Sequence, residues 1–316
     1  MGKGVSGSTE WGVKMKFLAK FGVLFLAVIF LSSCGSYPLE LGPALVVHPD
    51  VDPESWVLVP AGEFLAGQFN EEVLLDYDYQ LMVTEVTNQQ FADYLNEAIE
   101  AGAIKIVDEQ VVGYYPGDEF RGYRHEVEIS AGDWLYFPIE ADGLRVIFDG
   151  EQFVVREGYE NHPATNVTWF GAQAFCEYYG WRLPTDHEWE KAARGTQGWA
   201  YPWGNEISGE NANYYASGDP FEVYHGRIGD TTPVGFYNGG TYKGFQTEDS
   251  ASPYGAYDMA GNVEEWVGNV YENQHYRYLR GGSKAFYGFD LRVWVTNNSS
   301  PYYFSPSIGF RCAADG

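Results

Sequence analysis

From residue 196 to the C-terminus, glycine, asparagine and aromatic residues dominate the sequence, and no long run has helical spacing. Glycine and asparagine favour turns, whereas large aromatic side chains supply area for a core. The whole chain has 38 glycines and 17% aromatic residues, a composition unlike that of a helical bundle. The sequence therefore predicts a loop-rich fold packed with aromatic side chains.

The N-terminus has the pattern of an export signal. A lysine-containing stretch precedes an apolar run from Phe21 to Leu31, which is shorter than the roughly 20 residues that span a bilayer. The following Leu31-Ser32-Ser33-Cys34 resembles a bacterial lipobox, in which Cys34 would carry the lipid. We expect residues 1–33 to be a lipoprotein signal peptide and the protein to lie in the bacterial cell envelope, lipid-anchored and extracytoplasmic. An ordinary signal peptide with an incidental cysteine is the alternative.

Residues 34–54 contain four prolines and little periodicity, which is typical of a tether. We expect a domain over residues 55–316. Residues 98–160 alternate short β-like runs with glycine turns, and no linker separates them from the rest. They are interpreted as a β-rich insertion in this domain.

Local signals predict several elements before residue 196. Residues 56–67 have a strand, turn, strand pattern around Pro60-Ala61-Gly62. Three helices are predicted from threonine caps and apolar spacing. Within residues 79–96, a strand is followed by a helix that begins with a Thr87–Gln90 capping box. Within 166–180, Thr168 and Gly180 mark the two ends of a helix. Within 183–195, a helix begins with a Thr185–Glu188 capping box, and Gly195 lies past its end.

The formal net charge of −25 argues against a nucleic-acid partner, because phosphate binding needs clustered Lys and Arg. It leaves cation binding open, and solubility at a cell surface explains it equally well. None of the six histidines pairs with another at the spacing of a helical or zinc site. The sequence contains no G-x-S-x-G elbow, no Walker loop and no dinucleotide fingerprint after a strand.

Three cysteines are present: Cys34, Cys176 and Cys312. If Cys34 carries lipid, the other two form an even pair in an oxidising compartment. A disulfide between Cys176 and Cys312 would close a loop of about 136 residues. Two free buried thiols are the alternative.

The segment GAYDMAGNVEEWVGN, residues 255–269, carries a candidate cation site. Asp258 and Glu265 flank a glycine turn that would direct the carbonyls of Gly261 and Val263 between the two carboxylates. Hard cations such as calcium bind such mixtures of carboxylate and carbonyl oxygens. The alternative is a helix N-terminus whose dipole favours acidic residues.

A weaker signal lies at Asn213-Tyr214, which could offer a second pair of amide and carbonyl oxygens. Asp219 and Asp230 are nearby in the sequence and are candidate partners.

Eight segments in this order resemble the formylglycine-generating enzyme, or sulfatase-modifying factor, family. They are WVLVPAGEFLAG, VTEVTNQQFADYLN, HPATNVTWFGAQAFCEYYGWRLPTDHEWEKAARG, YPWGNE, TTPVGFYNGG, YGAYDMAGNVEEWVGN, RYLRGGS and IGFRCAAD. The resemblance runs from about Trp56 to Asp315 and leaves out the 98–160 insertion.

The resemblance implies an α+β, irregular mixed fold with low regular secondary structure, related to C-type lectin domains. It implies bound calcium, with Asp258, Gly261, Val263 and Glu265 as one site and Asn213 and Tyr214 as the start of another. The carboxylate that would complete this other site is missing at the expected offset before Thr231-Thr232-Pro233-Val234. The resemblance also implies the Cys176–Cys312 disulfide.

One departure affects function. In the aerobic enzymes of this family, two reactive cysteines hold a copper ion on a strand after Gly-Gly-Ser. The matching positions here are Phe286 and Leu291, which cannot ligate copper, so copper is not expected. A histidine of the family is Tyr287 here, and Ser283 is retained as a candidate remnant.

Three functions are compatible with these features. The preferred one is a lipid-anchored, calcium-stabilised binding or scaffold module without catalysis, with a protein, peptide or glycan ligand. The second is an oxidoreductase of the formylglycine-generating, sulfatase-activating type. The third is a retroelement-diversified display protein, because residues 284–307 are rich in Tyr, Phe, Ser and Asn.

Overall fold

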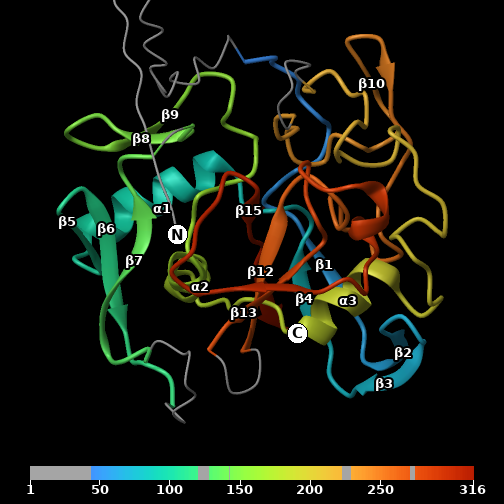
Figure 1. Ribbon diagram of the computed structural model, residues 1–316, viewed down its shortest axis with the longest axis horizontal. Coiled ribbons are helices and arrows are strands. Elements are labelled where there is room, and N and C mark those ends of the chain that lie inside the picture. The colour runs from blue at the N-terminus through green and yellow to red at the C-terminus, as the bar shows by residue number, and fades with distance from the viewer. Residues whose placement is uncertain (1–43, 120–127, 142, 223–228, 271–274) are drawn as a thin grey trace, which may run out of the picture. The chain divides into compact units, whose positions relative to one another are not determined.

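The computed structural model describes residues 44–119, 128–141, 143–222, 229–270 and 275–316 (Figure 1). The expected signal peptide, Cys34 and the first part of the expected tether lie outside the described residues. Within the described part, none of the helices has both the length and the apolar character that crossing a bilayer requires.

The described residues form many short strands and few helices, as a loop-rich fold requires. The helices are α1 (Asn88–Glu100), α2 (Trp169–Tyr178), α3 (Asp186–Arg194) and the 3₁₀ helix η1 (Gly288–Leu291). The strands are β1 (Trp56–Val59), β2 (Gly62–Ala66), β3 (Glu71–Leu75), β4 (Tyr79–Met82), β5 (Ile104–Val107), β6 (Gln110–Tyr115), β7 (Gly132–Pro138), β8 (Val146–Phe148), β9 (Phe153–Val155), β10 (Thr241–Tyr242), β11 (Phe245–Gln246), β12 (Glu264–Val270), β13 (Arg277–Arg280), β14 (Asn297–Ser299), β15 (Ile308–Gly309) and β16 (Ala313–Asp315).

The three predicted helices are confirmed, together with their N-caps. The hydroxyls of Thr87, Thr168 and Thr185 each accept a hydrogen bond from a backbone N–H in the first helical turn. α1 and α3 also have complete capping boxes, closed by Gln90 and Glu188. These signals are local in sequence, which is why they predict the helix starts well.

The strands combine into small sheets rather than one large sheet. β1, β4 and β16 form one, in that order, and β14, β13, β12 and β15 form another; β2 and β3 form a separate hairpin. The predicted strand, turn, strand at residues 56–67 is therefore correct, but its two strands pair with different partners. The α+β class with low regular secondary structure is confirmed.

Residues 98–160, which we interpret as an insertion, contain the end of α1 and the strands β5 to β9. β5, β6 and β7 form an antiparallel sheet, and β8 and β9 form a hairpin. Phe137 on β7 packs against Phe91 of α1, with 5.4 Å between ring centroids, so the insertion shares the core of the domain.

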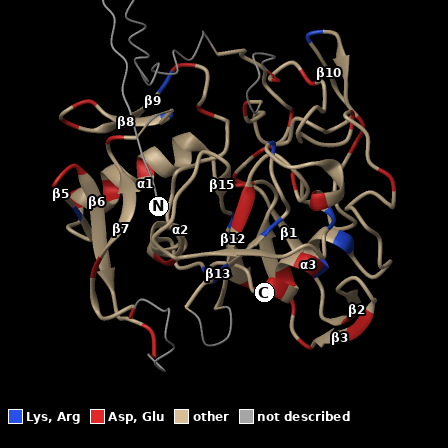
Figure 2. Ribbon diagram, viewed as in Figure 1, with Lys and Arg blue, Asp and Glu red and all other residues tan. Residues whose placement is uncertain are grey.

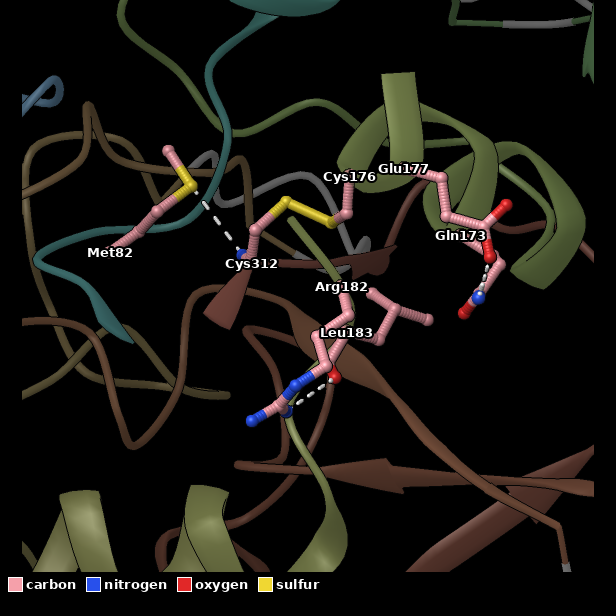
Figure 3. The surroundings of a disulfide bond; sticks show 7 residues. All are labelled: Met82, Gln173, Cys176, Glu177, Arg182, Leu183 and Cys312. Carbon is pink, nitrogen blue, oxygen red and sulfur yellow. Dashed lines mark hydrogen bonds between the residues drawn. A yellow bond between two sulfur atoms is a disulfide. The ribbon is translucent and has the colours of Figure 1, made fainter. Parts of the chain in front are cut away.

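The predicted disulfide is present between Cys176 of α2 and Cys312, just before β16 (Figure 3). Both cysteines are buried, and the Cys312 amide lies 3.4 Å from the Met82 sulfur on β4. The disulfide therefore links α2, in the middle of the chain, to the residue before the last strand, β16. The alternative of two free thiols is wrong.

Residues 44–54 were expected to belong to the tether. They form no helix or strand, yet Val47 is buried in a cluster with Phe221 and Phe236. This part of the chain therefore packs on the domain.

Candidate functional site

A buried ion pair lies at the centre of the first candidate cation site. Both oxygens of Glu265 accept hydrogen bonds from Arg311, at 2.7 and 2.8 Å, and Trp189 donates to one of them at 2.9 Å. Arg311 also donates to three backbone carbonyls, those of Met82, Val83 and Tyr257. Glu265, the second of the two glutamates that begin β12 (Figure 2), is therefore anchored in the core.

Two further carboxylates surround the same guanidinium. Asp258 accepts a hydrogen bond from the Gly235 amide at 2.6 Å, and Glu85 accepts one from the Asn262 side chain at 3.2 Å. Burial, partly offset by the Gly235 amide, raises the pKa of Asp258 to about 6. Burial and then the Asp258 charge raise the pKa of Glu85 well above its ordinary value. Three buried carboxylates thus face one arginine.

Gly261 joins the two candidate sites. Its φ is +91°, and an added Cβ would lie 2.4 Å from the carbonyl oxygen of Asn213. Only glycine permits this close approach. The neighbouring Asn262 amide donates to the same carbonyl at 2.8 Å. The segments around residues 213 and 261 are therefore packed backbone to backbone.

The first site fits a hard cation by its charge balance. Beside the Glu265–Arg311 pair, the Asp258 and Glu85 carboxyls have no cation of their own, and burial raises the pKa of both. Glu85 is therefore held protonated beside Asp258 unless a cation offsets the second charge. Among the described residues, no three His, Cys, Asp or Glu side chains are arranged to hold a metal on their own. A calcium ion here would therefore require backbone carbonyls as well, such as those predicted at Gly261 and Val263.

The second candidate site does not fit a cation. The Asp230 carboxylate is paired with Arg145, and the Asn213 side chain points its N–H₂ at the Asp230 carbonyl, at 2.8 Å. Asp219 accepts hydrogen bonds from Ser217, Tyr237 and the Phe221 amide. Tyr214 is half-buried beside Leu291 in an aromatic cluster. The backbone carbonyls of Asn213 and Tyr214 accept the amides of Asn262 and Ser217, so these carbonyls and both carboxylates already have hydrogen-bond donors.

The segment after Gly281-Gly282 is not the strand expected from the resemblance. β13 ends at Arg280, and a turn followed by η1 covers residues 283–291. Ser283 is buried, and its hydroxyl accepts a hydrogen bond from the Ala285 amide at 3.3 Å. Its backbone carbonyl accepts the Phe286 amide, which closes the turn.

Phe286 and Leu291 belong to one hydrophobic cluster in this segment. The Leu291 side chain is 0% exposed, and its methyl groups lie against the backbones of Gly261 and Gly282. Phe286 is half-buried in the same cluster. The two positions are therefore filled by packed hydrocarbon side chains.

Three aromatic rings beside this cluster face solvent, and we call them the aromatic surface: Tyr215, Tyr287 and Phe289. Their exposed fractions are 42%, 58% and 57%. The Tyr287 and Phe289 rings are 6.1 Å apart and nearly parallel, whereas Tyr215 meets Tyr287 edge-on at 5.2 Å. A hydrogen bond from the Tyr215 amide to the Phe286 carbonyl joins the two segments. Clustered exposed rings of this kind are typical of recognition surfaces.

Several residues of these sites had no signal in the sequence. Glu85, Arg145 and Arg311 contact partners far away along the chain, so spacing could not reveal them. Tyr215 lies next to the predicted Asn213-Tyr214 pair, but no pattern marks it as part of a surface. Three-dimensional proximity alone brings these side chains into the sites.

Comparison with known proteins gives a consistent result. The family model described as the sulfatase-modifying factor enzyme 1-like domain matches residues 44–316. The inactive C-alpha-formylglycine-generating enzyme 2 of Bos taurus is 31% identical over 249 residues, which cover 75% of this chain and 77% of that protein.

The serine/threonine-protein kinase pkn1 of Chlamydia caviae is 31% identical over 285 residues. The match covers 81% of this chain but 37% of the kinase, so the chain spans little more than a third of that protein. The solved structure of PvdO from Pseudomonas aeruginosa superimposes with a TM-score of 0.52 and 21% identity, covering 83% of this chain and 94% of that chain. It shares the fold.

Proposed function

The chain belongs to the sulfatase-modifying factor enzyme 1-like family, and from this premise we propose that it is a lipid-anchored binding module that has no oxidase activity. Its aromatic surface would contact the ligand. The anchor would be Cys34, in the bacterial cell envelope and outside the cytoplasm.

The observation that carries this proposal is the packing of Phe286 and Leu291. The resemblance places reactive cysteines at these two positions, and the chain fills both with hydrocarbon. Leu291 is fully buried between glycine backbones, so the segment has become part of the core. No thiolate is present there to ligate copper or to form a mixed disulfide with a substrate. The similar protein of Bos taurus, which is named as an inactive enzyme, supports the same interpretation.

The exposed rings supply a positive reason for binding. Tyrosine and phenylalanine offer large contact areas with little side-chain entropy to lose, and tyrosine adds a hydroxyl for hydrogen bonding. Peptides and glycans are the ligand classes that such a surface suits. Because the chain is strongly acidic, a ligand of neutral or positive charge is favoured over an anionic one.

Substitution of the aromatic surface tests the proposal. We expect a Tyr287→Ala/Phe289→Ala variant to lose at least about tenfold in affinity for any ligand found on immobilised peptide and glycan arrays, since each ring acts as an anchor. Phe69→Ala/Tyr114→Ala is the matched control, because both of these rings are exposed elsewhere. Equal losses in the two variants, or no binding by the unaltered protein on either array, would count against the proposal.

We also propose that calcium stabilises the domain at the site formed by Asp258, Gly261, Val263 and Glu265. The two buried carboxyls of Asp258 and Glu85 support this, since a divalent cation would let both ionise. Calcium at about 100 times its dissociation constant adds about 2.7 kcal/mol, or roughly 5 °C in Tm for a domain of this size. We expect EDTA to lower Tm by this amount and Asp258→Asn to remove the effect. A Tm that does not respond to calcium would contradict it.

The second candidate remains the oxidoreductase of the formylglycine-generating type, which the family membership supports. It would need a reactive group other than the two missing cysteines.

A further inference from the structure

The structure assigns Arg145 of the insertion as the cation of the second candidate site, in the place where the sequence predicted a metal ion. The guanidinium is thus a built-in counter-charge for Asp230, and the domain binds no calcium at Asn213 and Tyr214. This inference does not depend on whether the aromatic surface binds a ligand.

Arg145 and Asp230 form a close, largely buried contact. The distance from Nη2 to Oδ1 is 2.5 Å, and the two side chains are 11% and 20% exposed. The guanidinium also lies over the Tyr159 ring, 4.3 Å from its centroid, and the Tyr159 hydroxyl donates to the other Asp230 oxygen at 3.3 Å. Arg145 and Tyr159, which both belong to residues 98–160, therefore contact the same carboxylate.

Asp230 is in turn connected by hydrogen bonds to the two segments that carry the aromatic surface. Its carbonyl accepts the Asn213 side chain, and the Asn213 carbonyl accepts the Asn262 amide. The Asn262 carbonyl accepts the Lys284 amide at 3.0 Å, and Tyr215 follows Asn213 by two residues. A bound cation would organise backbone in a comparable way, by drawing carboxylate and amide groups to one point.

The local charge balance excludes a second divalent ion. Burial alone would raise the pKa of Asp230, but Arg145 and, to a smaller extent, Lys284 bring it below its ordinary value. Lys284 is itself buried and donates to the Pro306 carbonyl. One carboxylate thus faces two cationic side chains, whereas in the first site three carboxyl groups surround a single guanidinium. A calcium ion beside Asp230 would meet net positive charge.

The role of the Arg145 charge is tested by comparing Arg145→Lys with Arg145→Met in the full chain. Both replacements keep an apolar stem against Tyr159, but only lysine keeps the charge. We expect the methionine variant to melt at least about 4 °C below the lysine variant. Lys243→Met, at an exposed lysine away from this contact, is expected to melt like the unaltered protein. Equal Tm values for Arg145→Lys and Arg145→Met would overturn the assignment.

Calcium binding gives an independent measurement. In an Asp258→Asn background, calorimetric titration with calcium chloride is expected to show no binding, with or without Asp230→Asn. Calcium binding that persists in Asp258→Asn and disappears on adding Asp230→Asn would show a metal site at Asp230 and overturn the inference. This outcome is distinct from failure of the first site, in which the unaltered protein would bind no calcium.

Discussion

Replacing Cys176 and Cys312 together by alanine is expected to lower the free energy of unfolding by about 4–5 kcal/mol. The disulfide joins residues 136 positions apart, so it restricts a large part of the unfolded chain. In the chain-entropy model this restriction, rather than the contacts of the two sulfurs, supplies most of the stabilisation.

Urea unfolding of the double alanine variant and of the unaltered protein, both without reductant, measures the effect. Both sulfurs are buried, so adding reductant to the folded protein is expected to change little until the domain opens. Adding reductant during urea unfolding is expected to lower the urea midpoint of the unaltered protein to that of the variant. Identical urea midpoints for the two oxidised proteins would show that the disulfide contributes nothing.

Arg311→Met is expected to cost about 3–5 kcal/mol. Arg311 is fully buried and donates five hydrogen bonds, two of them to Glu265. Its removal would leave Glu265 without a counter-charge beside Asp258 and Glu85. An unpaired buried carboxylate is far more costly than a pair removed together.

The double variant Arg311→Met/Glu265→Gln distinguishes charge imbalance from lost packing. We expect it to be more stable than Arg311→Met alone, by about 1–3 kcal/mol, since the uncompensated charge is then absent. The single variant Glu265→Gln completes the double-mutant cycle. Additive effects of the two substitutions would show that the ion pair has no energetic coupling. If Arg311→Met fails to fold, recovery of folding by Glu265→Gln gives the same information.

Sequence patterns were most informative where the interaction is local. Thr87, Thr168 and Thr185 each bond an amide three residues ahead, so the helix starts follow from neighbouring residues. The pairing of β4 with β16 could not be predicted, because the partners lie at opposite ends of the domain. The exposed and buried residues of β7 do not alternate regularly, so periodicity alone does not reveal this strand.

The candidate sites show the same limit. Asp258 and Glu265 stand out because they flank a glycine turn, whereas Arg311 lies 46 residues beyond Glu265 and Arg145 lies 85 residues before Asp230. No local pattern indicates the charges that oppose these carboxylates. It predicted two cation sites of similar chemistry, and only the packing shows that one of them already contains an arginine.

The replacement of reactive thiols by Phe286 and Leu291 underlies the proposed function, and one assay tests it most directly. The full chain is incubated with a Cys-x-Pro-x-Arg peptide, oxygen and copper, and the peptide mass is then measured. We predict that the cysteine remains unchanged, as in a reaction without protein. Conversion of the cysteine to formylglycine would contradict the account and identify the protein as an oxidase.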